Sequence, residues 1–109
     1  MNCSRWATVV RVDVKRTQEF KDWIDDLKDV VGRMRILARI RRLADGNPGD
    51  HRNLSGGVSE LRIDVGPGYR VYYTHRGGEV VILLVGGDKS SKSAQQRDIA
   101  RAQELARHL

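Results

Sequence analysis

The spacing of apolar side chains changes three times along the chain, from a strand-like pattern to a helix-like pattern, back to strands, and to a final helix. Residues 8–14 are rich in β-branched side chains that partly alternate with polar ones, which predicts a first strand. Thr17 is a plausible N-cap for a helix that runs through Leu27. Apolar residues recur on one face of this helix, and they are Phe20, Trp23, Ile24 and Leu27. We expect this face to pack into the core.

A second helix is predicted between Val30 and Leu43, although a glycine at position 32 weakens its start. The apolar residues that keep helical spacing here are Met34, Ile36, Leu37, Ile40 and Leu43. Arginines fill most of the remaining positions. The turn-forming residues of segment 45–50 then end the helix. We expect the two helices to form a hairpin that packs on a sheet.

The second half of the chain returns to strand-like patterns. Three strands are predicted, at residues 57–65, 69–73 and 80–85. The short Gly-Pro-Gly and Arg-Gly-Gly-Glu segments between them are typical of tight connections. Segment 80–85 is apolar at every position, which favours a central strand covered on both faces. Gly86 and Gly87 are expected to break this strand.

A final helix is predicted after a serine N-cap at position 90, 91 or 93. Its apolar stripe is expected to contain Ile99, Ala102, Leu105 and Leu109. The element order is therefore β-α-α-β-β-β-α, which indicates an α+β fold with a mostly antiparallel sheet, a helical hairpin and a C-terminal helix. A length of 109 residues fits a single domain over residues 1–109.

The chain is strongly basic, and this charge indicates what kind of partner the protein binds. Lysine and arginine number 20 against 14 aspartates and glutamates, for a formal net charge of +6 and a pI near 10.0. This balance favours an anionic partner, either a nucleic acid or an acidic protein. Cys3 is the single cysteine, so neither an intrachain disulfide nor a cysteine-based zinc site can form. No secretory signal or membrane span is visible, and we expect a cytoplasmic protein.

Signatures of nucleotide and metal binding are missing. Residues 87–90 come nearest to a P-loop, but they lack its upstream glycine and its Gly-Lys step. His51, His75 and His108 are far apart and show no metal-ligand spacing. No metal site and no cofactor is therefore predicted.

Cations in the second half are the positive candidates. Arg62 and Arg70 belong to neighbouring predicted strands, so they can share one sheet face if the register allows, and Tyr72 lies on the face of Arg70. Lys89 follows the last strand, and Lys92 lies near the start of the final helix, whose amide groups can bind an anion. Together these groups could surround one phosphate.

Such a site suits RNA cleavage, because RNA carries its own nucleophile in the 2′-hydroxyl. Guanidinium and ammonium groups can stabilise the negative charge that develops on the attacked phosphate, without a metal. The proton acceptor is left open among Glu60, Asp64, Asp88, His51 and Tyr72. A plainer alternative is that Glu60 and Asp64 pair with Arg62, whose strand face they share.

The arginine-rich second helix also has two interpretations. Arg35, Arg39 and Arg42 could follow the phosphates of RNA or of the ribosome. Equally, they could form an ordinary solvated helix face.

Several motifs occur in the order found in one toxin superfamily. They are residues 20–23, 27–29, 46–50, 57–62, 66–72, 83–89 and 96–100. From Phe20 to Leu109 the chain resembles the RelE/ParE toxin superfamily, and most closely its HigB-like branch of addiction module killer proteins. The resemblance covers more than four-fifths of the chain.

The resemblance implies a toxin of a type II toxin–antitoxin module. Such toxins are neutralised by a cognate antitoxin that often carries a helix-turn-helix, and the basic charge predicts that it has an acidic wrapping segment. RelE-like members cleave mRNA in the ribosomal A site, whereas ParE-like members poison DNA gyrase. Arg70 falls on the arginine that contacts the scissile phosphate in RelE-like enzymes. Arg62 and Lys89 fall on basic positions of the same site.

One departure concerns the tyrosine that RelE-like enzymes carry near the start of the last helix. Ala94, Gln95 or Gln96 takes its place here, and Tyr72 or Tyr73 could substitute. The expected function is metal-independent, ribosome-dependent mRNA cleavage. The alternatives are a gyrase-targeting toxin without nuclease activity and an inactive relative that only binds its antitoxin.

Overall fold

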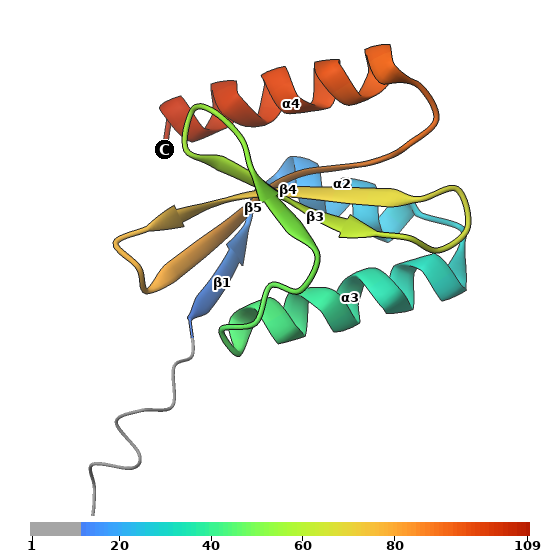
Figure 1. Ribbon diagram of the computed structural model, residues 1–109, viewed down its shortest axis with the longest axis horizontal. Helices are drawn as coiled ribbons and strands as arrows, with labels where there is room; N and C mark the ends of the chain where they lie inside the picture. Colours follow the sequence, from blue (N-terminus) through green and yellow to red (C-terminus); the bar gives the residue numbers. More distant parts are fainter. Residues whose placement is uncertain (1–11) are drawn as a thin grey trace, which may run out of the picture.

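A five-stranded sheet with helices on both faces makes up the part of the chain that the computed structural model describes, residues 12–109 (Figure 1). Helices α2 and α3 cover one face, and α4 crosses the other. The elements are β1 (Asp13–Arg16), α2 (Gln18–Asp26), α3 (Val30–Ala44), β2 (His51–Asn53), β3 (Val58–Ile63), β4 (Tyr69–Arg76), β5 (Val80–Asp88) and α4 (Lys92–Arg107).

The three helices begin where local side chains cap them. Thr17 accepts a hydrogen bond from the amide of Phe20 at 3.0 Å, and Asp29 accepts one from Gly32 at 3.0 Å. Ser91, one of the three predicted serines, accepts one from Ala94 at 3.1 Å. Each cap satisfies an amide that the first helical turn leaves without a partner. The predicted helices are therefore confirmed.

The strands follow the order β1-β5-β4-β3-β2, and β1 alone runs parallel to its neighbour, β5. The mostly antiparallel sheet is confirmed. Of the first strand predicted at residues 8–14, residues 8–11 lie outside the described residues, and β1 begins at Asp13. The short strand β2, which pairs with β3, was not predicted because its exposed His-Arg-Asn sequence has no strand pattern.

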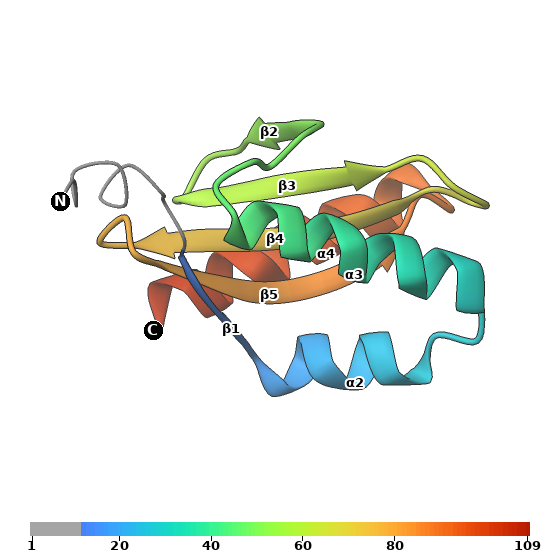
Figure 2. The ribbon, with the colours of Figure 1, turned by 90° about the horizontal axis from the view of Figure 1, so that it is seen from below.

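Two apolar layers lie on opposite sides of the sheet. Figure 2 shows the sheet between α3 and α4. The larger layer joins the sheet to α2 and α3 and includes Phe20, Ile24, Ile36, Leu43, Leu61, Val71 and Tyr73. The smaller layer joins the sheet to α4 and includes Val58, Tyr72, Leu84, Val85 and Ala102. Strand β5 contributes to both layers, which confirms that it is covered on both faces. A register shift opposite Tyr72 and Tyr73 places the neighbours Leu84 and Val85 in the same layer.

Some residues expected in the core are exposed. On α3, Ile36 and Leu43 are buried, but Met34 is 64% exposed and Leu37 is 42% exposed. The helix thus carries apolar residues on two sides, and only one side meets the sheet. Leu109 is also 51% exposed, because α4 ends at Arg107.

Gly86 and Gly87 do not break β5, contrary to expectation, because the strand continues to Asp88. Neither has a positive φ, so their role is to leave space rather than to allow an unusual backbone. A Cβ atom at Gly86 would overlap the indole ring of Trp23. A Cβ atom at Gly87 would overlap the carboxylate of Asp98 on α4.

Replacing Gly86 with alanine should destabilise the fold. We expect a loss of about 1–3 kcal/mol in the free energy of unfolding, measured by chemical denaturation, because the indole must move. Adding Trp23→Leu should make the double variant more stable than the sum of the two single changes predicts. An unchanged unfolding midpoint for Gly86→Ala would show that the contact is not restrictive.

Candidate functional site

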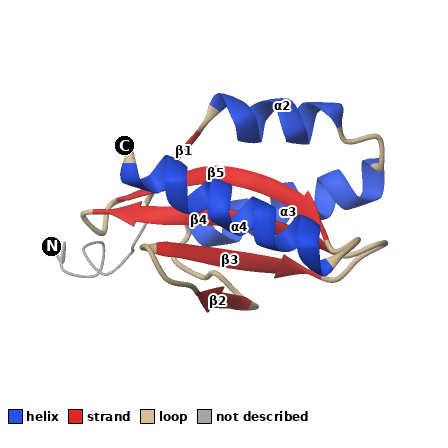
Figure 3. Cartoon of the chain, turned by 90° about the horizontal axis from the view of Figure 1, so that it is seen from above, coloured by secondary structure: helices blue, strands red, loops and turns tan. Residues whose placement is uncertain are grey.

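Arg62 and Arg70 lie directly opposite each other on β3 and β4, and Gly87 of β5 lies opposite Arg70. The neighbouring pair, Glu60 and Tyr72, points to the same side, because residues two apart on a strand share a face. Tyr72 packs in the layer beneath α4, so this is the face that α4 covers (Figure 3). The predicted shared face of the two arginines is confirmed.

Arg70 and Glu60 form a buried pair beneath α4. Arg70 is 3% exposed and Glu60 is 2% exposed, and Arg70 Nε lies 3.9 Å from Glu60 Oε1. Arg70 Nη1 donates to the carbonyl of Tyr69 at 3.0 Å, while its buried Nε has no hydrogen-bond partner. Arg52 Nη2 lies 3.3 Å from the same Glu60 oxygen. Glu60 therefore faces Arg70 and Arg52, and the expected pairing of Glu60 with Arg62 is wrong.

Tyr72 is fully buried beside this pair, and its hydroxyl has no hydrogen-bond partner. Burial raises the pKa of Tyr72 to about 12, and the negative charge of Glu60 adds to the effect. At neutral pH the phenol stays protonated, and its burial with no hydrogen-bond partner makes it a poorer base than an exposed tyrosine would be.

Asp98 of α4 is a candidate that the sequence analysis missed. Its carboxylate lies against Gly87, the residue opposite Arg70. Partial burial raises the pKa of Asp98, the charge of Asp88 raises it further, and Arg97 opposes both. A glycine in an apolar strand can signal the close approach of another group, and this was the available clue. The Asp98 carboxylate can therefore act as an acid or a base beside the cross-strand neighbours Arg62, Arg70 and Gly87.

Polar contacts, most of them exposed, attach α4 to the rest of the fold. Arg101 donates from Nη2 and Nε to Glu19 of α2, at 2.6 Å and 3.0 Å. Gln103 donates to the carbonyl of Ser55 at 3.1 Å, and Arg76 donates to that of Ala106 at 3.0 Å. Exposed contacts of this kind contribute little each, so α4 is held mainly by the apolar layer that it shares with the sheet.

The other predicted residues of the site lie at its edges. Arg62 is half-buried, whereas Lys89 and Lys92 are exposed where β5 leads into α4. The amide of Lys89 donates to the carbonyl of Gly68 at 2.9 Å, which fixes its backbone beside the β3–β4 connection. His51 is opposite Leu61, whose side chain belongs to the layer of α2 and α3, so the structure does not bring His51 to this face.

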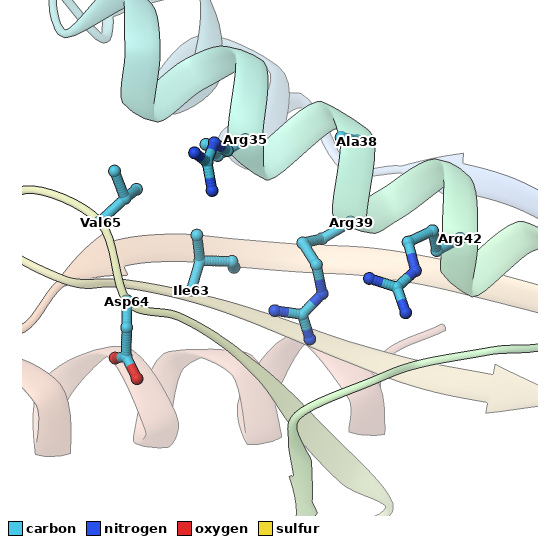
Figure 4. A pocket seen from close by; sticks show the side chains of 7 residues that line it. All are labelled: Arg35, Ala38, Arg39, Arg42, Ile63, Asp64 and Val65. Carbon is cyan, nitrogen blue, oxygen red and sulfur yellow. The ribbon is translucent and has the colours of Figure 1, made fainter.

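Arg35, Arg39 and Arg42 lie on the other side of the sheet. They line a pocket of about 210 Å³ between α3 and the end of β3, with Asp64 on its far wall (Figure 4). Arg35 and Arg42 are exposed and face this pocket.

Arg39 has a structural role in this pocket. Its Nη1 donates to the carbonyl of Arg62 at 2.7 Å, and its Nη2 donates to the carbonyls of Pro48 and Asp50 at 2.8 Å and 2.9 Å. These bonds occupy the guanidinium and tie α3 to β3 and to segment 45–50. Arg39 is therefore less available to an external phosphate than Arg35 or Arg42.

Within residues 12–109, no three histidine, cysteine, aspartate or glutamate side chains gather as metal ligands. The same residues include no helix that is long and apolar enough to cross a membrane.

Comparison with known sequences gives a family and a close relative. The family described as "Phage derived protein Gp49-like (DUF891)" matches residues 22–107. A protein of Haemophilus influenzae, described as an uncharacterized protein, is 46% identical over 98 residues, which cover 90% of this chain and 96% of that protein.

Solved structures of RelE toxins share the fold. A free Escherichia coli RelE variant with two arginine-to-alanine changes has a TM-score of 0.64 at 12% identity, over 84% of this chain and 98% of that one. The E. coli RelBE toxin–antitoxin complex gives 0.56 at 14% identity, over 73% and 99%. A RelBE toxin–antitoxin complex from Mycobacterium tuberculosis gives 0.50 at 20% identity, over 75% and 95%. At such identities the likeness shows the RelE-like fold.

All three tyrosines should ionise above the ordinary range near pH 10. The hydrogen bond to Asp29 raises the pKa of Tyr69 to about 12, burial raises that of Tyr72 to about 12, and burial also raises that of Tyr73. Because the folded state holds these protons more tightly than the unfolded state does, the tyrosines contribute fully to the free energy of unfolding below about pH 10. This contribution is lost as pH rises toward about 12. Ultraviolet titration with circular dichroism in parallel should show no phenolate near pH 10 while the fold persists. A tyrosine that ionises there in the folded protein would contradict this arrangement.

Proposed function

The chain belongs to the Gp49-like family and has the fold of RelE toxins, and from this premise we propose that it is the toxin of a type II toxin–antitoxin module that cleaves mRNA on the ribosome. The observation that carries the proposal is the pair Arg62 and Arg70, side by side on one sheet face, with Lys89 at the end of β5. Their sequence context resembles that of the HigB-like branch. Toxin–antitoxin complexes among the related folds support a cognate antitoxin as partner.

In the proposed chemistry the 2′-oxygen of RNA loses its proton and bonds to the adjacent phosphorus, while the bond from that phosphorus to the 5′-oxygen of the next nucleotide breaks. The products are a 2′,3′-cyclic phosphate and a 5′-hydroxyl, whose oxygen takes a proton from the protonated acceptor or from water. Arg62, Arg70 and Lys89 stabilise the negative charge that develops on the phosphate, so the chain's own cations suffice for this role. Arginine suits it because its guanidinium grips two phosphate oxygens and keeps its charge. Asp98 is the proton acceptor in this proposal. It lies against Gly87, the residue opposite Arg70, and Tyr72 stays protonated.

Access to Arg70 requires a movement of α4. In the described arrangement Arg62, Lys89 and Lys92 can meet an incoming phosphate, but Arg70 is sealed. A shift of α4 would break the contacts of Arg101 with Glu19 and uncover the apolar layer around Ala102, so it needs a partner that supplies the energy. Docking on the ribosome would supply the energy for this shift, and the exposed Arg35 and Arg42 are the proposed contacts with ribosomal phosphates.

The burial of Arg70 also favours a second candidate. A toxin that binds gyrase through an exposed surface would need no open phosphate site. A relative that only binds its antitoxin would need neither a phosphate site nor a gyrase-binding surface. Growth arrest with DNA damage but without new RNA ends would support the gyrase candidate. Normal growth with folded, expressed protein would support the inactive relative.

Mapping of RNA 5′ ends after brief induction in a heterologous bacterium tests the main proposal. We expect new cuts within translated frames that disappear when translation is blocked. Lys89→Ala and Arg62→Ala should each lower cutting about 100-fold, as the loss of one charge-stabilising donor does elsewhere. The matched control is Lys15→Ala, an exposed cation on the edge strand β1, two strands away from Arg70, which should cut normally.

Arg70 needs a different variant, because Arg70→Ala would leave the buried Glu60 with Arg52 in place of two cations and would leave a cavity, both of which destabilise the fold. The double change Glu60→Gln with Arg70→Gln removes both charges and should fold but not cut. Full cutting by this folded double variant would exclude Arg70 from the reaction.

A further inference from the structure

The outer face of α3 carries a stripe of exposed apolar side chains, formed by Val30, Val31, Met34 and Leu37. They are 56%, 59%, 64% and 42% exposed, and among the described residues they are four of the five large apolar side chains with such exposure. Their spacing places them on one side of the helix, opposite the buried Ile36. Exposed apolar clusters of this kind mark interaction sites on proteins that otherwise bury such groups.

The stripe is bordered by arginines and by no acidic residue of α3 itself. Arg33 lies on one side, Arg35 and Arg42 on the other, and Arg41 continues the stripe toward the end of the helix. The arginine-lined pocket adjoins the stripe, because Ala38, one turn after Met34, lines it (Figure 4). An apolar band with a cationic border is complementary to an amphipathic segment with an acidic border.

Other occupants fit this surface less well. A second copy of the chain would bring one set of arginines against another, in a protein with a net charge of +6. RNA would find partners in Arg35 and Arg42, but its phosphates gain nothing from Met34 and Leu37. An acidic amphipathic helix satisfies both features at once.

We propose that this face of α3 is the docking surface for the cognate antitoxin, which lays an amphipathic helical segment on the stripe and places carboxylates over Arg35 and Arg42. The distance from Val30 to Arg42 along the axis is about 18 Å, so about three turns of a partner helix cover it. This inference rests on the proposed function, since it needs a toxin–antitoxin pair. It goes beyond that function by assigning the surface to which the antitoxin binds.

The surface lies on the side of the sheet away from Arg70. An antitoxin docked here leaves the candidate catalytic face uncovered and takes up the two arginines proposed to meet the ribosome. Neutralisation then works by competition for α3 rather than by filling the nuclease site.

The test uses the purified full chain and the purified protein encoded beside it, with affinity measured by calorimetry. Met34→Asp and Leu37→Asp should each weaken binding about 30-fold or more, as central interface residues do. Leu109→Asp is the matched control, since Leu109 is 51% exposed at the far end of the chain, and it should bind like the parent. Arg35→Glu should weaken binding in a salt-dependent way, and Arg107→Glu on α4 should not.

Several results would overturn the inference. It is wrong if the neighbouring protein does not bind the parent chain, or if Met34→Asp and Leu37→Asp bind as tightly as Leu109→Asp. It is also wrong if sedimentation shows a dimer of the parent that these two changes dissociate. Because binding is measured without any RNA, a chain that never cuts mRNA would refute the proposed function and leave this test intact.

Discussion

The backbone of β5 is approached from both sides at two consecutive residues, and this crowding governs how the layers meet. Trp23 of α2 lies against Gly86, and Asp98 of α4 lies against Gly87. Because β5 is bonded to both β1 and β4, these contacts fix α2 and α4 to the strand that holds the sheet together. A side chain at either glycine would push a whole helix outward, since packed interiors do not absorb an extra carbon freely.

The candidate site inherits its character from this packing. A helix that comes close enough to set Asp98 against Gly87 also covers Arg70, Glu60 and Tyr72. The buried arginine–glutamate pair is held at 3.9 Å with Arg70 Nε unbonded, so it is preoriented but not fully satisfied. The unbonded Nε of Arg70 gains a strong acceptor if a phosphate reaches it once the cover moves, although the charge of Glu60 opposes the phosphate.

Local features made much of the fold predictable from sequence. Caps such as Thr17 act within one helical turn, and alternation with a short connection made a shared face for Arg62 and Arg70 possible, while the register that brings them opposite each other came from the structure. Interactions between distant segments were not predictable. A glycine in a strand either ends it or makes room, and the groups that need the room at Gly86 and Gly87 belong to other elements. For the same reason the sequence did not show which side chains α4 would bury.

Arg39 links the two faces of the sheet mechanically. Its guanidinium binds the backbone carbonyl of Arg62, whose side chain points to the opposite face, and also two carbonyls of segment 45–50. Helix α3 therefore cannot tilt or slide without stretching these bonds or dragging β3 with it. Arg39 thus joins the helix that carries the proposed docking surface to the backbone of a residue whose side chain belongs to the candidate catalytic face.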